Sequence, residues 1–178
     1  LKFEIESLSS LEFGLTQDLL KKEKDYLLLA NFYMYKQVPF DATKTLELGF
    51  KRNIIKRTSK NLETLSNAYI GSRDKVKAAD TLREASKLSD KPELSYRLGQ
   101  VEMSLSRWDK AIESFKAAKT KGWKKEKGKI EYFIGISLIE LEKYNEASRY
   151  LSQSADLGQE KIANPWLEYI DYLEKTSG

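Results

Sequence analysis

The sequence predicts an all-α protein built from repeated pairs of helices, and three observations lead to this prediction. Similar residues recur every 33 to 36 positions, a period that is typical of helical repeat arrays. Within each period, apolar residues follow the i, i+3, i+4, i+7 spacing of amphipathic helices, and no segment shows the sustained alternation of a β-strand. We therefore expect stacked helix pairs without a sheet.

Matched small and large apolar residues carry this period. Four alanines lie 36, 33 and 36 positions apart: Ala42, Ala78, Ala111 and Ala147. Each is followed four positions later by a large apolar residue: Leu46, Leu82, Phe115 and Leu151. A second register has the same spacings: Leu29, Leu65, Leu98 and Ile134. Because independent positions agree on one period, chance is a poor explanation for it.

The elements follow in order from this register. Residues 1–13 predict a leading half-repeat helix, because residues 11–14 resemble residues 46–49. Four helix pairs are then expected: 24–36 with 39–50, 59–71 with 74–88, 92–105 with 107–120, and 127–141 with 143–157. A last helix over 163–175 carries apolar residues on one side: Trp166, Leu167, Ile170 and Leu173. It belongs to no pair, and since repeat arrays need an end piece with one polar face, we expect it to be the cap.

Prolines and glycines mark the expected boundaries of the helices. All three prolines are predicted in the first turn of a helix, the position that proline prefers: Pro39, Pro92 and Pro165. Five glycines are expected just past helix ends: Gly14, Gly49, Gly71, Gly122 and Gly158. The whole chain, 1–178, is thus predicted as one solenoid: a half repeat (1–22), repeats (23–58, 59–91, 92–127, 128–158) and a capping helix (159–178).

Composition argues against several classes of function. The chain has no Cys and no His, which removes thiolate nucleophiles, the usual proton shuttle and the commonest metal ligands. Acid pairs such as Glu140 and Glu142 fall on polar helix faces beside lysines, where solvated ion pairs are the expected use. A mean hydropathy of −0.58, without an apolar run near 18 residues, argues against a membrane span. We expect no catalysis, no cofactor, no metal and no small-molecule substrate.

The charge is mild but uneven. The net charge is +4, and residues 116–129 hold seven lysines against the single acid Glu126. Such a cluster can meet phosphates, but lysines near a helix C-terminus also complement the helix dipole. Stripes of arginine interleaved with aromatic residues are absent. We therefore favour a solvated helix end and loop over a nucleic-acid site.

The third unit carries a resemblance to a known repeat. Residues 95–99 (Ser-Tyr-Arg-Leu-Gly) are followed by Trp108, Ala111, Phe115 and Ala118, the order found in the tetratricopeptide repeat (TPR). The fourth unit is nearly as close, and the two earlier units are degenerate. The resemblance covers nearly the whole chain and implies a right-handed α–α superhelix with a concave groove lined by the first helix of each pair.

The resemblance also selects the residues that would line the groove: Asn31, Met34, Lys60, Asn67, Tyr96, Gln100, Met103, Lys129, Tyr132 and Ile136. The three amides among them are expected to form a row, since an amide both donates and accepts hydrogen bonds to a ligand backbone. The methionines would adapt to varied apolar partners, and Tyr96 and Tyr132 would serve as anchors.

Two functions stay open at this point. The chain is either a module that binds a peptide or protein segment in its groove, or an assembly element that self-associates through its ends or convex face. Short segments such as 35–37, 61–65 and 166–170 (Trp-Leu-Glu-Tyr-Ile) also resemble bacterial TPR proteins encoded beside TonB–ExbB–ExbD genes. That narrower resemblance implies a periplasmic protein that assists transport, with a cytoplasmic location as the alternative.

Overall fold

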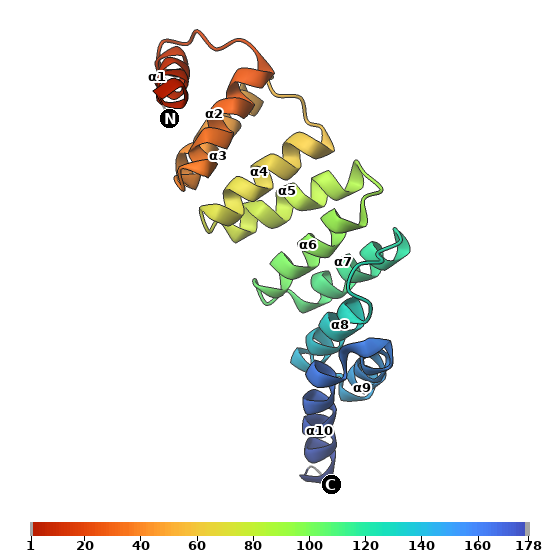
Figure 1. Cartoon of the computed structure of the whole chain (residues 1–178). Coiled ribbons are helices and arrows are strands. Elements are labelled where there is room, and N and C mark those ends of the chain that lie inside the picture. The colour runs from red at the N-terminus through yellow and green to blue at the C-terminus, as the bar shows by residue number, and fades with distance from the viewer. Residues whose placement is uncertain (1, 177–178) are drawn as a thin grey trace. The chain divides into compact units, whose positions relative to one another are not determined.

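The computed structural model describes residues 2–176, with the side chains of residues 8–176, and contains helices and loops but no strand in that range (Figure 1). The all-α prediction is confirmed. The α-helices, in order, are α1 (Lys2–Thr16), α2 (Glu23–Tyr35), α3 (Pro39–Lys51), α4 (Ser59–Gly71), α5 (Lys75–Lys87), α6 (Pro92–Met103), α7 (Trp108–Thr120), α8 (Lys129–Glu140), α9 (Tyr144–Ser154) and α10 (Glu160–Thr176).

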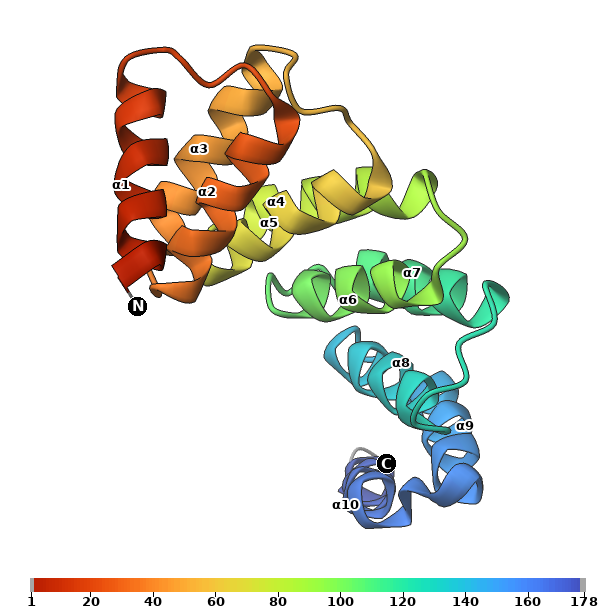
Figure 2. The same cartoon turned by 45° about the horizontal axis from the view of Figure 1, so that its top comes forward.

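The chain divides into two compact units, unit 1 (Leu1–Ser89) and unit 2 (Asp90–Gly178). In unit 1, α1 lies beside α2, and the pairs α2–α3 and α4–α5 pack on each other through α3 and α4 (Figure 2). In unit 2, the pairs α6–α7 and α8–α9 pack through α7 and α8, and α10 packs on α9. The boundary falls next to the predicted border between residues 59–91 and 92–127, and one continuous solenoid over 1–178 stays a prediction.

The predicted register forms the core of both units. The four alanines of the period and the large apolar residues that follow them (Leu46, Leu82, Phe115 and Leu151) are each 0% exposed. Small residues opposite them allow close helix contact: a Cβ added to Gly99 would lie 2.7 Å from the Phe115 ring, and one added to Gly135 would lie 2.7 Å from Leu151. The sequence period is therefore a packing period.

The turn inside each helix pair has a recurrent backbone geometry that the sequence did not predict. Its left-handed residue is never glycine: Gln37 (φ 60°), Arg73 (φ 63°), Ser106 (φ 54°) and Glu142 (φ 58°) lie 36, 33 and 36 positions apart. In each turn, the N–H of the following residue donates to a carbonyl five positions earlier, as in Asp74 N to Tyr69 O at 2.9 Å. These bonds satisfy helix-end carbonyls and offset the cost of a left-handed side-chain residue.

The prediction that five glycines lie just past helix ends is wrong in part. Gly14 and Gly49 lie inside α1 and α3, and Gly71 is the last residue of α4. Gly49 serves packing, because a Cβ there would lie 2.5 Å from Ile55. Gly122 and Gly158 do stand in left-handed turns, with φ of 86° and 93°.

Pro39 and Pro92 begin their helices as predicted, but Pro165 lies inside α10. The reason is the connection before it. A π-helical turn, η1 (Ala155–Gln159), follows α9, and Gly158 within it breaks the helical path. The last helix consequently begins at Glu160, five residues before Pro165.

The last helix packs on unit 2 with the face that was predicted for the cap. Ala163 is 0% exposed and Ile170 is 2% exposed, and both belong to the core of this unit. Trp166 is half-buried, and its Nε1–H donates to the Tyr132 hydroxyl at 3.2 Å, so α10 is tied to α8 as well as packed on α9. Tyr172 on the opposite face is 62% exposed.

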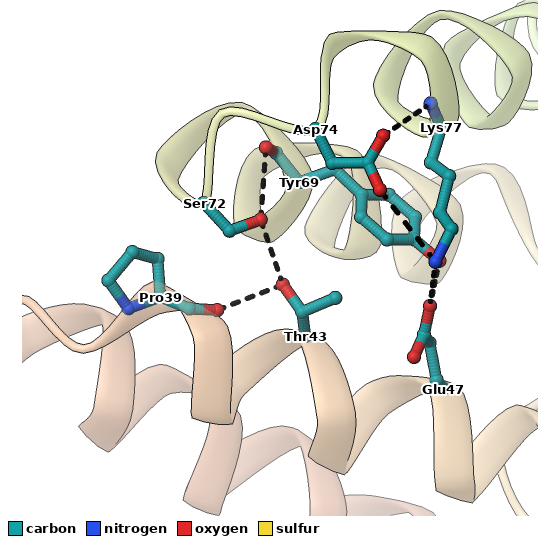
Figure 3. A network of polar contacts seen from close by, with 7 residues as sticks. All are labelled: Pro39, Thr43, Glu47, Tyr69, Ser72, Asp74 and Lys77. Atoms are coloured by element: carbon teal, nitrogen blue, oxygen red, sulfur yellow. Dashed lines mark hydrogen bonds and ion pairs between the residues drawn. The ribbon is translucent and has the colours of Figure 1, made fainter.

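A polar network joins the two helix pairs of unit 1 (Figure 3). The Tyr69 hydroxyl donates to Glu47 Oε1 at 2.7 Å, and Lys77 Nζ donates to the same oxygen at 3.0 Å. Thr43 and Ser72 hydroxyls lie 3.4 Å apart nearby. Burial alone would raise the pKa of Glu47, but the hydrogen bonds from Tyr69 and Lys77 outweigh it and hold that pKa below its usual value.

Acidification is expected to weaken this junction. The pKa of Glu47 is lower in the folded chain than in the unfolded chain. The ionised Glu47 carboxylate therefore stabilises the folded chain at neutral pH, and this stabilisation is lost progressively as pH falls below about 4.3. Glu47→Gln should lower the free energy of unfolding at pH 7 by about 1 kcal/mol, since the carboxylate is partly exposed. Urea unfolding at pH 7 and pH 3 measures this.

The difference between wild type and Glu47→Gln should shrink at pH 3, because Glu47 of the unfolded chain is protonated there and part of the stabilisation from the ionised carboxylate is lost. The matched control is Glu113→Gln, at an exposed position of α7. A difference that stays the same at both pH values would mean that the ionised form of Glu47 contributes nothing to the junction.

Candidate protein-binding surface

The predicted groove residues of unit 1 lie on α2 and α4, the first helices of their pairs. Asn31, Lys60 and Asn67 are exposed, and Met34 is half-buried. The Met34 methyl lies 3.4 Å from the place of a Cβ on Gly71, which puts it beside the end of α4. The first helices of two neighbouring pairs thus both expose predicted groove residues, which are mostly polar.

A hollow of about 210 Å³ lies on one face of α2 in unit 1, and we call it the α2 hollow. Its lining residues follow helical spacing: Leu28, Asn31, Phe32, Tyr35 and Lys36. Leu28 is 47% exposed and Tyr35 is 75% exposed. The hollow therefore combines an amide, apolar side chains and one cation on a single helix face.

Of these lining residues, only Asn31 was predicted as a site residue. Leu28 and Tyr35 could have been found from the excess of apolar residues in α2, where Tyr26 and Leu29 already fill the core. An amphipathic helix buries one stripe of such residues. The apolar residues left outside that stripe are candidates for a binding surface.

The predicted site residues of unit 2 divide between surface and interior. Gln100 on α6 is exposed and Met103 is half-buried. On α8, Lys129, Tyr132 and Ile136 are all half-buried. Tyr132 accepts the hydrogen bond from Trp166, so part of its polar capacity is used within the unit. That the three amides of units 1 and 2 form one row stays a prediction.

Tyr96 does not lie where an exposed anchor would lie. Its side chain is 7% exposed and stacks on Trp123, with ring centroids 4.0 Å apart and an interplanar angle of 11°. Its ring also meets Phe115 edge-on at 5.7 Å. Burial, followed by the nearby carboxylate of Glu126, raises the pKa of Tyr96 to about 12, so the hydroxyl stays protonated. We therefore assign Tyr96 to the core and exclude it from the candidate surface.

Neither a metal centre nor a membrane-spanning helix is found in the part of the chain that the structure describes. Over that part, no three His, Cys, Asp or Glu residues gather in a group that could hold a metal ion. None of its helices has both the length and the apolar composition needed to cross a membrane.

Comparisons with known proteins concern the fold. No protein-family model and no curated protein matches the chain. A crystal structure of MamA has a TM-score of 0.67 and 23% identity, over 86% of this chain and 88% of that one. MamA from Desulfovibrio magneticus RS-1 has a TM-score of 0.70 and 18% identity, over 88% and 87%.

The C-terminal part of a TPR repeat-containing protein from Cytophaga hutchinsonii is also similar. It has a TM-score of 0.71 and 13% identity, over 98% of this chain and 67% of that chain. At these identities the likeness is one of fold. Together with the helix pairs and their register, it shows that the chain has a TPR-like fold.

Proposed function

We propose that this chain is a non-catalytic interaction module that binds a peptide or protein segment on the first helices of its pairs. The observation that supports this most is the α2 hollow, where the predicted residue Asn31 lies among apolar side chains. Exposed apolar side chains gathered at one place mark interaction surfaces more often than scattered ones do.

The chemistry of the α2 hollow suits an extended peptide with an apolar side chain. The Asn31 amide can donate to and accept from a peptide backbone, each bond contributing about 0.5–1.5 kcal/mol net. Leu28 and Tyr35 would bury an apolar side chain of the ligand, and aromatic residues are enriched where interfaces bind most strongly. Because no single contact suffices, we expect affinity in the micromolar range, spread over several residues.

A peptide library displayed on phage, selected on the immobilised chain, tests this proposal. Selected peptides should bind in solution, and Leu28→Ala combined with Asn31→Ala should weaken binding at least about tenfold, or 1.4 kcal/mol. The matched control is Tyr172→Ala, an exposed position in unit 2. Isothermal titration calorimetry gives the affinities, and the thermal unfolding temperature should stay nearly unchanged.

Two results would contradict the proposal. The first is a selection that returns no peptide able to bind in solution. The second is binding that survives the Leu28 and Asn31 substitutions. If those substitutions do weaken binding, adding Asn67→Ala separates a contact to α2 alone from one that extends to α4 in unit 1.

Self-association is the second candidate function, and a specific observation favours it. Among the exposed apolar side chains of unit 1 that do not line the α2 hollow, Phe13 (62%), Leu19 (63%) and Phe40 (60%) are exposed most. Such side chains could be covered by a second copy of the chain. Sedimentation equilibrium at several concentrations distinguishes this from a monomeric binding module, and Phe13→Ser with Leu19→Ser should abolish any dimer that uses them.

A role beside the TonB–ExbB–ExbD system in the periplasm is the finer form of the proposal, and it rests on the sequence resemblance alone. Fractionation of the native cells, followed by detection of the chain in the periplasmic fraction, tests the location. Co-purification with the ExbB–ExbD complex tests the association. If the chain is found in the cytoplasmic fraction, the proposed periplasmic role is wrong, whereas the proposal of a binding module is unaffected.

A further inference from the structure

Unit 2 holds a second hollow that the proposed function does not use. It has a volume of about 280 Å³ and lies by the loop between α7 and α8. We call it the lysine hollow, after the lining residues that matter here: Lys119, Lys124, Lys125, Lys127, Trp123 and Leu157. It gathers part of the basic cluster of residues 116–129, which the sequence predicts to be a solvated helix end and loop.

Two of the four lysines are neutralised by carboxylates. Lys119 Nζ lies 2.8 Å from Glu131 Oε1, and Glu131 also lines the hollow, with its side chain only 8% exposed. Lys125 Nζ lies 2.9 Å from Glu93 Oε1. These pairs hold the acidic groups of the site in place, so the carboxylates do not compete for the remaining lysines.

The other two lysines, Lys124 and Lys127, are exposed and have no acidic partner among residues 8–176. They stand just before α8, which begins after Gly128 without a side-chain cap. The start of α8 also lines the hollow, through Gly128 and Ile130, so the helix dipole adds positive potential there. The Lys129 N–H itself donates to the Glu126 carbonyl at 3.1 Å. The free charge of the lysine hollow is therefore positive.

The wall of the lysine hollow also offers apolar surface, and Trp123 is part of that wall. Leu157 is 44% exposed, and Ile130 in the floor is 2% exposed. The Trp123 Nε1–H is shielded from solvent and finds no acceptor among the described residues. Because Trp123 lines the hollow, its indole N–H reports on a ligand bound there.

We infer that the lysine hollow binds an acidic segment of a partner protein, in which an apolar side chain stands beside two or more carboxylates. The carboxylates pair with Lys124 and Lys127, and the apolar side chain packs on Leu157. Inorganic phosphate would leave that apolar surface unused. Nucleic acid would need aromatic faces for base stacking, whereas one face of Trp123 is already covered by Tyr96.

The test uses the full chain and an end-blocked peptide, Asp-Glu-Leu-Asp-Glu, with Asn-Gln-Leu-Asn-Gln as its neutral counterpart. ¹⁵N-edited NMR follows the indole N–H of Trp123, assigned by Trp123→Phe, and calorimetry gives the affinity. The acidic peptide should shift this indole signal and bind more weakly as salt rises, because exposed charges are screened. The neutral peptide should do neither.

Matched variants separate the site from general charge. Lys124→Ser with Lys127→Ser should weaken binding of the acidic peptide about tenfold or more. Lys110→Ser with Lys116→Ser makes the same charge change at exposed positions of α7, and it should change affinity less than about twofold. Leu157→Ser should weaken binding while leaving its salt dependence unchanged.

Several outcomes would overturn the inference. If both double lysine variants lose the same affinity for the acidic peptide, the peptide is attracted to basic surface in general and not to the lysine hollow. Equal binding of the neutral peptide would remove the role of the carboxylates. If inorganic phosphate or single-stranded RNA binds more tightly than the acidic peptide at the same salt concentration, the ligand of the hollow is not an acidic protein segment. The α2 hollow plays no part in this test, so its result is independent of the proposed function.

Discussion

Replacing Phe115 by alanine is expected to lower the free energy of unfolding by about 3–5 kcal/mol, the range for a buried Phe→Ala change. Its side chain is 0% exposed. The ring stacks on Phe133 with centroids 5.3 Å apart and occupies the space that Gly99 leaves open. Because these neighbours come from two other helices, α6 and α8, the cavity cannot close by the movement of one side chain.

Urea unfolding followed by far-UV circular dichroism measures this loss. The matched control is Phe13→Ala, which removes an equally large side chain that is 62% exposed, and it should cost less than about 0.5 kcal/mol. A loss below about 1 kcal/mol for Phe115→Ala would contradict the packing described for the α6–α7 pair.

Ile170→Ala in the last helix should cost about 2–5 kcal/mol. Ile170 is 2% exposed and belongs to the core of unit 2, although it lies outside the repeats. It is a sharper probe than Trp166, which is only half-buried and would also lose its hydrogen bond to Tyr132. The experiment thus asks whether α10 is part of the fold or an appendage.

The matched control for the cap is Tyr172→Ala, on the same helix at 62% exposure. It should leave the free energy of unfolding within about 0.5 kcal/mol of wild type. If Ile170→Ala is equally neutral, α10 does not stabilise unit 2 and the cap assignment fails.

The helices were largely predictable because their determinants are local. Apolar spacing and first-turn prolines placed α3 and α6 to within two residues at each end. The start of α10 was not predictable in this way, because Gly158 and the π-helical turn move it ahead of Pro165. The left-handed turn residues were missed as well, because no residue type distinguishes Gln37, Arg73, Ser106 and Glu142.

The candidate surface was predictable only in part. Asn31, which its register position predicts for the groove, lines the α2 hollow. Leu28 and Tyr35 can be recognised as apolar residues outside the buried stripe of α2, but only the structure shows that they gather with Asn31 in one hollow. Tyr96 shows the opposite error. Its place in the repeat predicts a groove residue, but Trp123, from a loop 27 positions later, stacks on its ring.

The helical class, the order of the helix pairs and most residues of the core thus follow from the sequence alone. They do so because helix formation and the repeat register depend on neighbours three, four and about 35 positions away. The tertiary structure was needed to show which apolar side chains stay exposed, such as Leu28 and Tyr35, and which lysines of the lysine hollow form ion pairs, namely Lys119 and Lys125. Exposure and ion pairing depend on atoms that chain folding brings together from separate segments, and no local spacing records that.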